Sequence, residues 1–258
     1  MPTSWQHLKK TLTSRSKKTC IIIKIFKSIL KIIVGLVLLG IISYGILYLI
    51  YNEPLPEMEE SFEADMLANK MLKALDHEAY KNTRYLEWSF RNGAHQFLWD
   101  KKLGHVEVEW DNYVVSLHLN AMERSTVYRN GIEVLGKDKN EILKRATSLF
   151  NNDSFWLVAP FKVFDQGVKR GIVIMEDGSR GLLVKYTSGG TTPGDTYLWK
   201  LQENGIPESY QMWVQLIPIG GIEATWDNWQ EMESGTFLPK SHELGPITLQ
   251  MGEIRAYN

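Results

Sequence analysis

Cysteine is almost absent from this chain of 258 residues, and the only one is Cys20. It lies before the long apolar run described below, so it is not the lipidation cysteine of a bacterial lipoprotein, which would follow such a run. The rest of the chain therefore has no disulfide and no thiol chemistry.

Catalytic signatures are also missing. The sequence has no helical His-Glu pair of the zinc-protease type, no Gly-x-Ser-x-Gly elbow and no dinucleotide fingerprint. Its most phosphate-like stretch, Ser188–Asp195, lacks the lysine of a phosphate loop and is more simply a flexible hairpin connection. We therefore expect a protein that is not an enzyme and has no cofactor.

Acidic residues are absent from the first 51 positions, which carry eight Lys or Arg. All 30 acids and the other 21 bases lie after Tyr51. This split excludes a uniformly basic nucleic-acid binder. Basic patches with interleaved aromatics are absent after the apolar run, so nucleic acid is not an expected partner.

A long apolar run is present, from Ile32 to Tyr51, without any charge. Its 20 residues at 1.5 Å each match a hydrocarbon core of about 30 Å. A buried core helix is the alternative, but such helices are usually amphipathic and shorter. A cleaved signal peptide is another, but Ser43-Tyr44-Gly45 is a poor cleavage site inside the run.

The charges around the run predict its direction. Eight bases precede it, and Lys24, Lys27 and Lys31 share one helical face that can reach lipid headgroups. The positive-inside rule then places residues 1–31 in the cytoplasm and residues 52–258 outside. We predict a single-pass protein of the bacterial inner membrane with a periplasmic C-terminal domain.

The part after the span begins with an acidic, proline-containing stretch, residues 52–60, which we interpret as a short stiff linker. Residues 61–258 are predicted to form one exported domain. Helical spacing predicts a helix from a cap at Ser61 to about His77–Lys81, and another over Lys139–Phe150 capped by Asp138. Alternating patterns predict strands at Tyr85–Arg91, His95–Asp100, His105–Trp110, Tyr113–Asn120, Ser125–Arg129, Val168–Met175, Gly181–Thr187, Thr196–Leu201, Glu208–Ile217, Glu223–Glu231 and Ile247–Tyr257.

This content predicts an α+β fold. After the transmembrane helix we expect a strongly curved antiparallel sheet, an open half-barrel of about eleven strands, with two or three helices on its concave side.

One hairpin can be read in register. If Asp111-Asn112 is the turn, Trp110 faces Tyr113 on a wholly apolar face, and His105 faces His118 on the other. We predict that the apolar face lines the inside. The candidate lining residues for an apolar ligand are Trp88, Phe90, Phe97, Trp99, Val108, Trp110, Tyr113, Val115, Leu117 and Trp213.

Tryptophan is abundant, and eight of nine lie after the span. Ordinary core packing explains any single one. A curved sheet with more aromatic lining than its helices can cover would instead leave a groove for acyl chains.

The polar face of the hairpin suggests a different chemistry. His105 and His118, with Glu107 and Glu109 beside them, are a set that could hold zinc in a hydrolase. A solvated polar face is the simpler interpretation, and we predict no metal.

The order of elements resembles the superfamily of bacterial outer-membrane lipoprotein carriers and receptors. The resemblance covers about Ser61–Tyr257 and rests on the leading helix, the Tyr85–Phe90 meander, the Phe155–Phe161 stretch and the Trp-rich closing sheet. Gly189–Tyr197 with Met212–Trp229 also resembles uncharacterised membrane-associated proteins of the Bacteroidota. The resemblance implies an open half-barrel whose hollow holds acyl chains. A tethered chain departs from the soluble carriers, which shuttle after their signal is cleaved, and the arginine that carriers use could correspond to Arg84 or Arg91.

Two functions remain open. The first is a membrane-anchored periplasmic domain that binds a lipid or lipoprotein acyl chain and acts in envelope lipid handling or sensing. The second is a structural or interaction subunit of an envelope complex, with a fully packed core and a protein partner.

Overall fold

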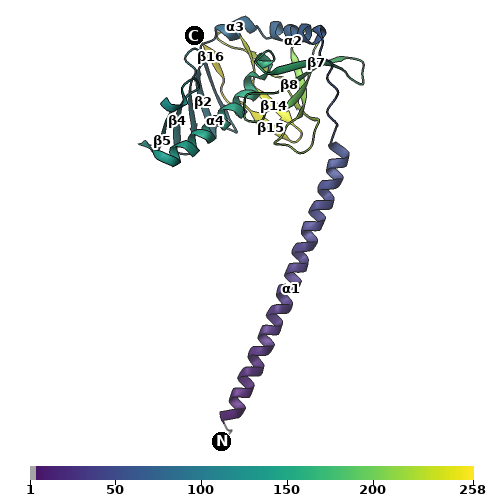
Figure 1. Ribbon diagram of the computed structural model, residues 1–258, viewed down its shortest axis with the longest axis vertical. Coiled ribbons are helices and arrows are strands. Elements are labelled where there is room, and N and C mark those ends of the chain that lie inside the picture. The colour runs from purple at the N-terminus through teal and green to yellow at the C-terminus, as the bar shows by residue number, and fades with distance from the viewer. Residues whose placement is uncertain (1–3) are drawn as a thin grey trace. The chain divides into compact units, whose positions relative to one another are not determined.

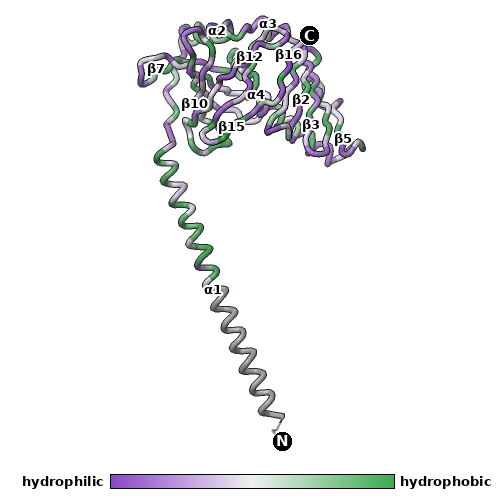
Figure 2. The backbone as a smooth tube through the Cα atoms, turned by 180° about the vertical axis from the view of Figure 1, so that it is seen from behind, coloured by the Kyte–Doolittle hydropathy of each residue, from purple (hydrophilic) through white to green (hydrophobic). Residues whose placement is uncertain are grey.

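The computed structural model describes residues 4–258, with side-chain environments from Phe26 onward. The chain divides into two compact units, residues 1–52 and 53–258. The first holds one continuous helix, α1 (Ser4–Tyr51), in which Phe26–Tyr51 is long and apolar enough to cross a membrane. The apolar side chains of this part of the helix are exposed, and Figure 2 colours it as largely hydrophobic. A membrane anchor and a signal sequence both fit this helix.

The second unit is α+β, as predicted, and its sheets are antiparallel and unclosed (Figure 1). The helix predicted from Ser61 is two helices, α2 (Phe62–Ala74) and α3 (His77–Asn82). Ser61 does cap α2, since its hydroxyl accepts from the Ala64 N–H. Asp76 separates the helices because its left-handed backbone (φ 51°) stops the first, while its carboxylate caps the second.

Seven strands form the larger sheet, in the order β16-β1-β2-β3-β4-β5-β6. Its strands are β1 (Tyr85–Phe90), β2 (His95–Asp100), β3 (His105–Trp110), β4 (Tyr113–His118), β5 (Thr126–Arg129), β6 (Ile132–Glu133) and β16 (Arg255–Tyr257). The hairpin register is confirmed: Trp110 pairs with Tyr113 and His105 with His118. A short 3-10 turn, η1 (Met122–Arg124), precedes β5.

Five strands form a separate second sheet, in the order β11-β10-β9-β8-β7. They are β7 (Val168–Ile174), β8 (Arg180–Tyr186), β9 (Thr196–Leu201), β10 (Pro207–Trp213) and β11 (Ile222–Thr225). The strand predicted over Glu223–Glu231 is two separate strands: β11 ends at Thr225, and β12 begins at Trp229, directly after Asn228, whose backbone is left-handed (φ 54°). Two small hairpins follow, β12 (Trp229–Glu231) with β13 (Phe237–Pro239) and β14 (Ser241–Leu244) with β15 (Ile247–Gln250).

One long helix, α4 (Gly136–Val158), packs on the larger sheet against β4 and β5 and lies across it in Figure 1. It begins before the predicted Lys139 and runs eight residues past Phe150, with Asp138 in its first turn and not at its cap. A 3-10 turn, η2 (Ala159–Lys162), continues it. Its inward side is apolar, with Leu143, Ala146 and Leu157 buried.

The segment interpreted as a linker lies along the smaller sheet. The backbone N–H of Glu53 donates to the carbonyl of Gly220 (3.0 Å), and Glu59 pairs with Ile172 of β7. Lys169 and Glu60 form an ion pair at 2.7 Å. We call residues 53–60 the strap. It covers the β7 edge of the sheet, which would otherwise be open for pairing.

Candidate functional site

The larger sheet brings nine of the ten predicted lining residues onto one face. The register places Phe97 opposite both Trp88 and Val108, and Trp99 opposite Val106. This face, which we call the inner face, is buried: Trp88, Phe90 and Phe97 are each only 2% exposed. Val108, Val115 and Leu117 are fully buried, Trp110 nearly so, and Trp99 and Tyr113 are partly buried and pack against the same core.

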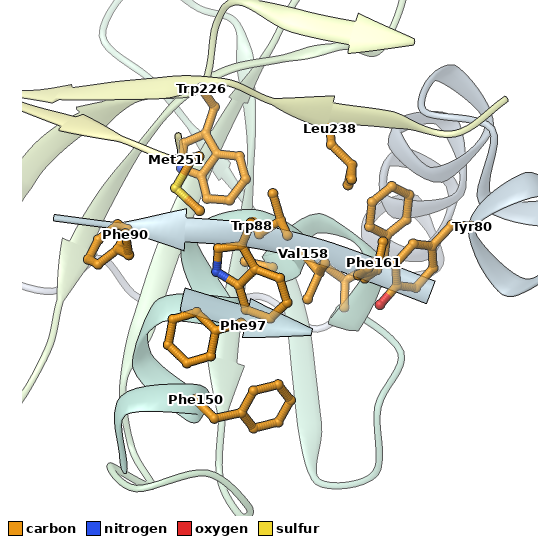
Figure 3. Packing of buried hydrophobic residues seen from close by; sticks show 14 of the residues in the cluster. Tyr80, Trp88, Phe90, Phe97, Phe150, Val158, Phe161, Trp226, Leu238 and Met251 are labelled. Carbon is orange, nitrogen blue, oxygen red and sulfur yellow. The ribbon is translucent and has the colours of Figure 1, made fainter. Parts of the chain in front are cut away.

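Helix α4 covers the inner face with an aromatic contact. Phe150 meets Trp99 edge to face, with ring centroids 5.2 Å apart, and lies 6.3 Å from the Trp88 ring. The Trp88 and Phe97 rings stack at 4.7 Å. Figure 3 shows the Trp88 and Phe97 rings beside each other, with Phe150 of the helix below them. Further along α4, the guanidinium of Arg145 lies 5.5 Å from the Trp110 ring.

The inner face contains polar groups without partners. The indole Nε1 atoms of Trp88, Trp99 and Trp110 are buried and have no hydrogen-bond partner among the described residues. An indole N–H is a donor only, and leaving a buried donor unpaired costs about 1–3 kcal/mol. Most buried polar side-chain atoms in proteins are paired, so these three donors are unusual, as are Trp199 Nε1, Trp226 Nε1 and the Tyr210 hydroxyl elsewhere in the core.

A buried hydrogen bond joins α4 to the same sheet. His95 Nδ1 lies 2.6 Å from Asp153 Oδ2, and Asn152 donates to the other carboxylate oxygen at 2.8 Å. Burial raises the pKa of Asp153 above its ordinary value, although these hydrogen bonds oppose the shift. The contact between His95 and Asp153 was not predicted from the sequence. The only signal was that His95 precedes Phe97 by two residues and so shares its face.

Trp213 does not belong to the inner face. It lies on β10 of the smaller sheet, and its indole N–H donates to the carbonyl of Glu53 at 2.9 Å. The prediction grouped it with the others because it is a strand tryptophan, and composition cannot tell one sheet from the other.

The smaller sheet has its own aromatic cluster, in the Trp-rich part of the chain that the sequence analysis describes as the closing sheet. Trp199 meets Trp226 at 4.8 Å and Tyr210 at 4.9 Å. The Trp226 ring also lies 4.5 Å from the imidazole of His242, which is fully buried. The His242 ring lies between two carbonyls, with Nδ1 2.8 Å from Thr225 O and Nε2 2.7 Å from Trp156 O, and a neutral imidazole donates to only one of them.

The histidine pair considered for zinc lies on the opposite, outer face. The rings of His105 and His118 are 4.8 Å apart, and His105 Nε2 lies 2.5 Å from the Ser116 hydroxyl. Burial, followed by the neighbouring Glu107, raises the pKa of Glu109. Within residues 4–258 no three His, Cys, Asp or Glu side chains gather as a metal site, so nothing described supports the zinc hypothesis.

A pocket lies outside the inner face, between α2 and β7. Its lining is Glu60, Ser61, Phe62, Asp65, Val168, Lys169 and Arg170. The charges in it are already paired, since Arg170 Nε donates to Asp65 at 2.6 Å and Lys169 to Glu60 at 2.7 Å. It is therefore a poor candidate for an apolar ligand.

Comparisons with known proteins do not assign this chain to a family. No family model matches the chain, and no curated protein matches it. Three chains of solved structures match. One is a DUF1329 family protein from Desulfovibrio piger, with 9% identity, a TM-score of 0.37, and coverage of 75% of this chain and 92% of that one. Membership in the lipoprotein-carrier superfamily therefore stays a prediction.

Proposed function

We propose that residues 53–258 are a membrane-anchored, extracytoplasmic domain that binds a lipid or acyl chain between the inner face and helix α4. The observation that carries the proposal is the set of three buried indole donors, without partners among the described residues, on a largely apolar face. An acyl chain would match the apolar side chains, and its ester or carboxyl oxygens would accept from the indoles.

Membrane anchorage is part of the proposal. It is supported by the apolar length of Phe26–Tyr51 and by the eight bases that precede Ile32. The proposed orientation places the N-terminus in the cytoplasm and the binding domain in the bacterial periplasm. The proposed role is envelope lipid or lipoprotein handling or sensing, without a catalytic step.

Quenching of tryptophan fluorescence by a brominated fatty acid tests the binding proposal. The chain that enters the site would lie against Trp88, Trp99 and Trp110, so we expect saturable quenching. A variant with all three changed to Phe keeps the aromatic volume nearly intact and should lose this quenching. Quenching that is absent, or that persists unchanged in the variant, would exclude the inner face as the site.

A second candidate is a structural or interaction subunit with a filled core. It is favoured by the near-complete burial of Trp88, Phe90 and Phe97, which leaves α4 in direct contact with the sheet. This candidate predicts no quenching by fatty acid and a stable envelope protein partner after purification in mild detergent.

A further inference from the structure

Glu53 is the first residue of the second unit, and hydrogen bonds hold it against the end of the smaller sheet. Glu53, the second residue after the helix ends at Tyr51, makes three contacts with the end of the smaller sheet. Its backbone N–H donates to Gly220, its carbonyl accepts from the Trp213 indole at 2.9 Å, and its carboxylate accepts from the Gln211 amide at 2.9 Å.

Glycine makes this close approach possible. A Cβ on Gly221, whose φ is +80°, would lie 2.5 Å from the Glu53 Cβ, and one on Gly220 would lie 2.4 Å from Trp213 Cδ1. The contact between strap and loop is therefore built into the sequence. Two residues span at most about 7 Å, so the loop between β10 and β11 is tied to the end of the span by a very short chain.

That loop is apolar and uncharged. No charged residue occurs from Ser209 to Ile222, and the loop reads Val-Gln-Leu-Ile-Pro-Ile-Gly-Gly from Val214. Leu216 is 73% exposed, and Leu55 of the strap is 45% exposed. Both leucines belong to segments held close to the end of the apolar helix, where contact with lipid would bury their side chains.

We propose that the β10–β11 loop, with Leu216 at its tip, and Leu55 of the strap dock into the bilayer surface beside the anchor. This inference rests on the membrane anchorage within the proposed function, and it adds a second membrane contact to it. The headgroup region begins where the hydrocarbon span ends and is several Å deep on each side, since a bilayer of about 40–45 Å encloses a core of about 30 Å. Glu53, to which the loop is hydrogen-bonded, lies within about 7 Å of the last span residue, so the attachment point of the loop is within reach of that region.

The charges favour apolar insertion over electrostatic attraction. The loop has no base, and the strap carries Glu53, Glu57, Glu59 and Glu60. Docking should therefore be insensitive to salt and should not require anionic lipid. Interfacial insertion by Leu and Ile depends on the apolar area buried.

Site-specific fluorescence on the full chain tests the docking. The single cysteine is replaced by Cys20→Ser, and an environment-sensitive dye is attached after Leu216→Cys. The protein is placed in phosphatidylcholine nanodiscs that contain nitroxide-labelled lipid. Ile132→Cys is the matched control, because Ile132 is also 73% exposed but lies on the edge strand β6 of the larger sheet. Leu39→Cys, inside the span, reports on anchorage.

We expect the dye at 216 to be blue-shifted and quenched several-fold more than the dye at 132, equally at low and high salt. Equal, weak quenching at 216 and 132, with strong quenching at 39, would overturn docking and leave anchorage intact. Loss of the quenching at 216 in high salt would also overturn it, because it would indicate an electrostatic contact. A dye at 39 that is not quenched would overturn docking and anchorage together, while fatty-acid binding by the inner face is measured separately.

Discussion

Replacing His242 by alanine should destabilise the second unit strongly. The side chain is fully buried, and its two nitrogens face the carbonyls of Thr225 and Trp156 at 2.8 and 2.7 Å. It thus joins β14, the end of β11 and the last turns of α4. Alanine leaves a buried carbonyl without its donor, which costs about 1–3 kcal/mol, and opens a cavity beside Trp226 that adds a comparable amount.

We therefore expect the free energy of unfolding to fall by about 3–5 kcal/mol, a large part of the 5–15 kcal/mol typical of a domain. Urea unfolding of the full chain in detergent micelles, followed by tryptophan fluorescence, measures it. His118→Ala is the control, since His118 lies on the outer face and should cost less than about 1 kcal/mol. If His242→Ala lowers the free energy of unfolding by less than about 1 kcal/mol, the side chain does not hold these segments together.

The same histidine predicts a pH dependence. Burial lowers the pKa of His242 below its ordinary value, although the two carbonyls oppose this. The unfolded chain then takes up a proton near pH 6.5 while the folded one does not, so stability is complete above about pH 6.5 and is lost as pH falls below it. The slope attributable to this group is at most about 1.4 kcal/mol per pH unit. The difference between wild type and His242→Ala, measured from pH 7 to pH 5, should therefore shrink as the pH falls, and a constant difference would contradict the shift.

Three further predictions concern other contacts. Asp153→Ala should remove the bond to His95 and lower the free energy of unfolding by about 2–3 kcal/mol in the same urea assay; an unchanged midpoint would contradict it. Gly171→Val should release the strap from β7, because a Cβ at this position would lie 2.5 Å from Met58 Cγ. Limited proteolysis should then cut the chain within residues 53–60. Continued protection of these residues would show that the strap adapts to the larger side chain. Trp88→Phe breaks no hydrogen bond with another described residue, so it should lower the free energy of unfolding by at most about 1–2 kcal/mol, yet it should reduce any lipid that copurifies; full retention of lipid would show that this indole does not contact it.

Strands β1 to β4 of the larger sheet could be predicted from the sequence because local patterns define them, whereas β6 was not predicted and the strand predicted over Ile247–Tyr257 is divided between β15 and β16. Strict alternation and the Asp111-Asn112 turn determine which residues pair across β3 and β4, and a one-residue slip would turn the apolar face to solvent. The face shared by Trp88, Phe97 and Trp99 follows from the same period of two.

Local sequence patterns could not predict which strands belong to which sheet, and they could not predict the buried polar contacts. Helix α4 continues through Asn151-Asn152-Asp153, a sequence typical of a helix end, because His95 and the surrounding core satisfy the buried carboxylate. The segment predicted as one strand is broken after Thr225, and Asn228 between β11 and β12 has a left-handed backbone. His242 finds a partner in Trp156, which is 86 residues away, and no local pattern carries that information.

The central claim, an inner face that holds a lipid, is tested most directly by native mass spectrometry of residues 53–258 purified without detergent. This stretch forms a compact unit with its own core. We predict an added mass of several hundred daltons that extracts into organic solvent and is reduced by Trp88→Phe. A protein of bare mass that also fails to bind a fluorescent fatty acid would contradict the claim and favour a filled core that serves a protein partner.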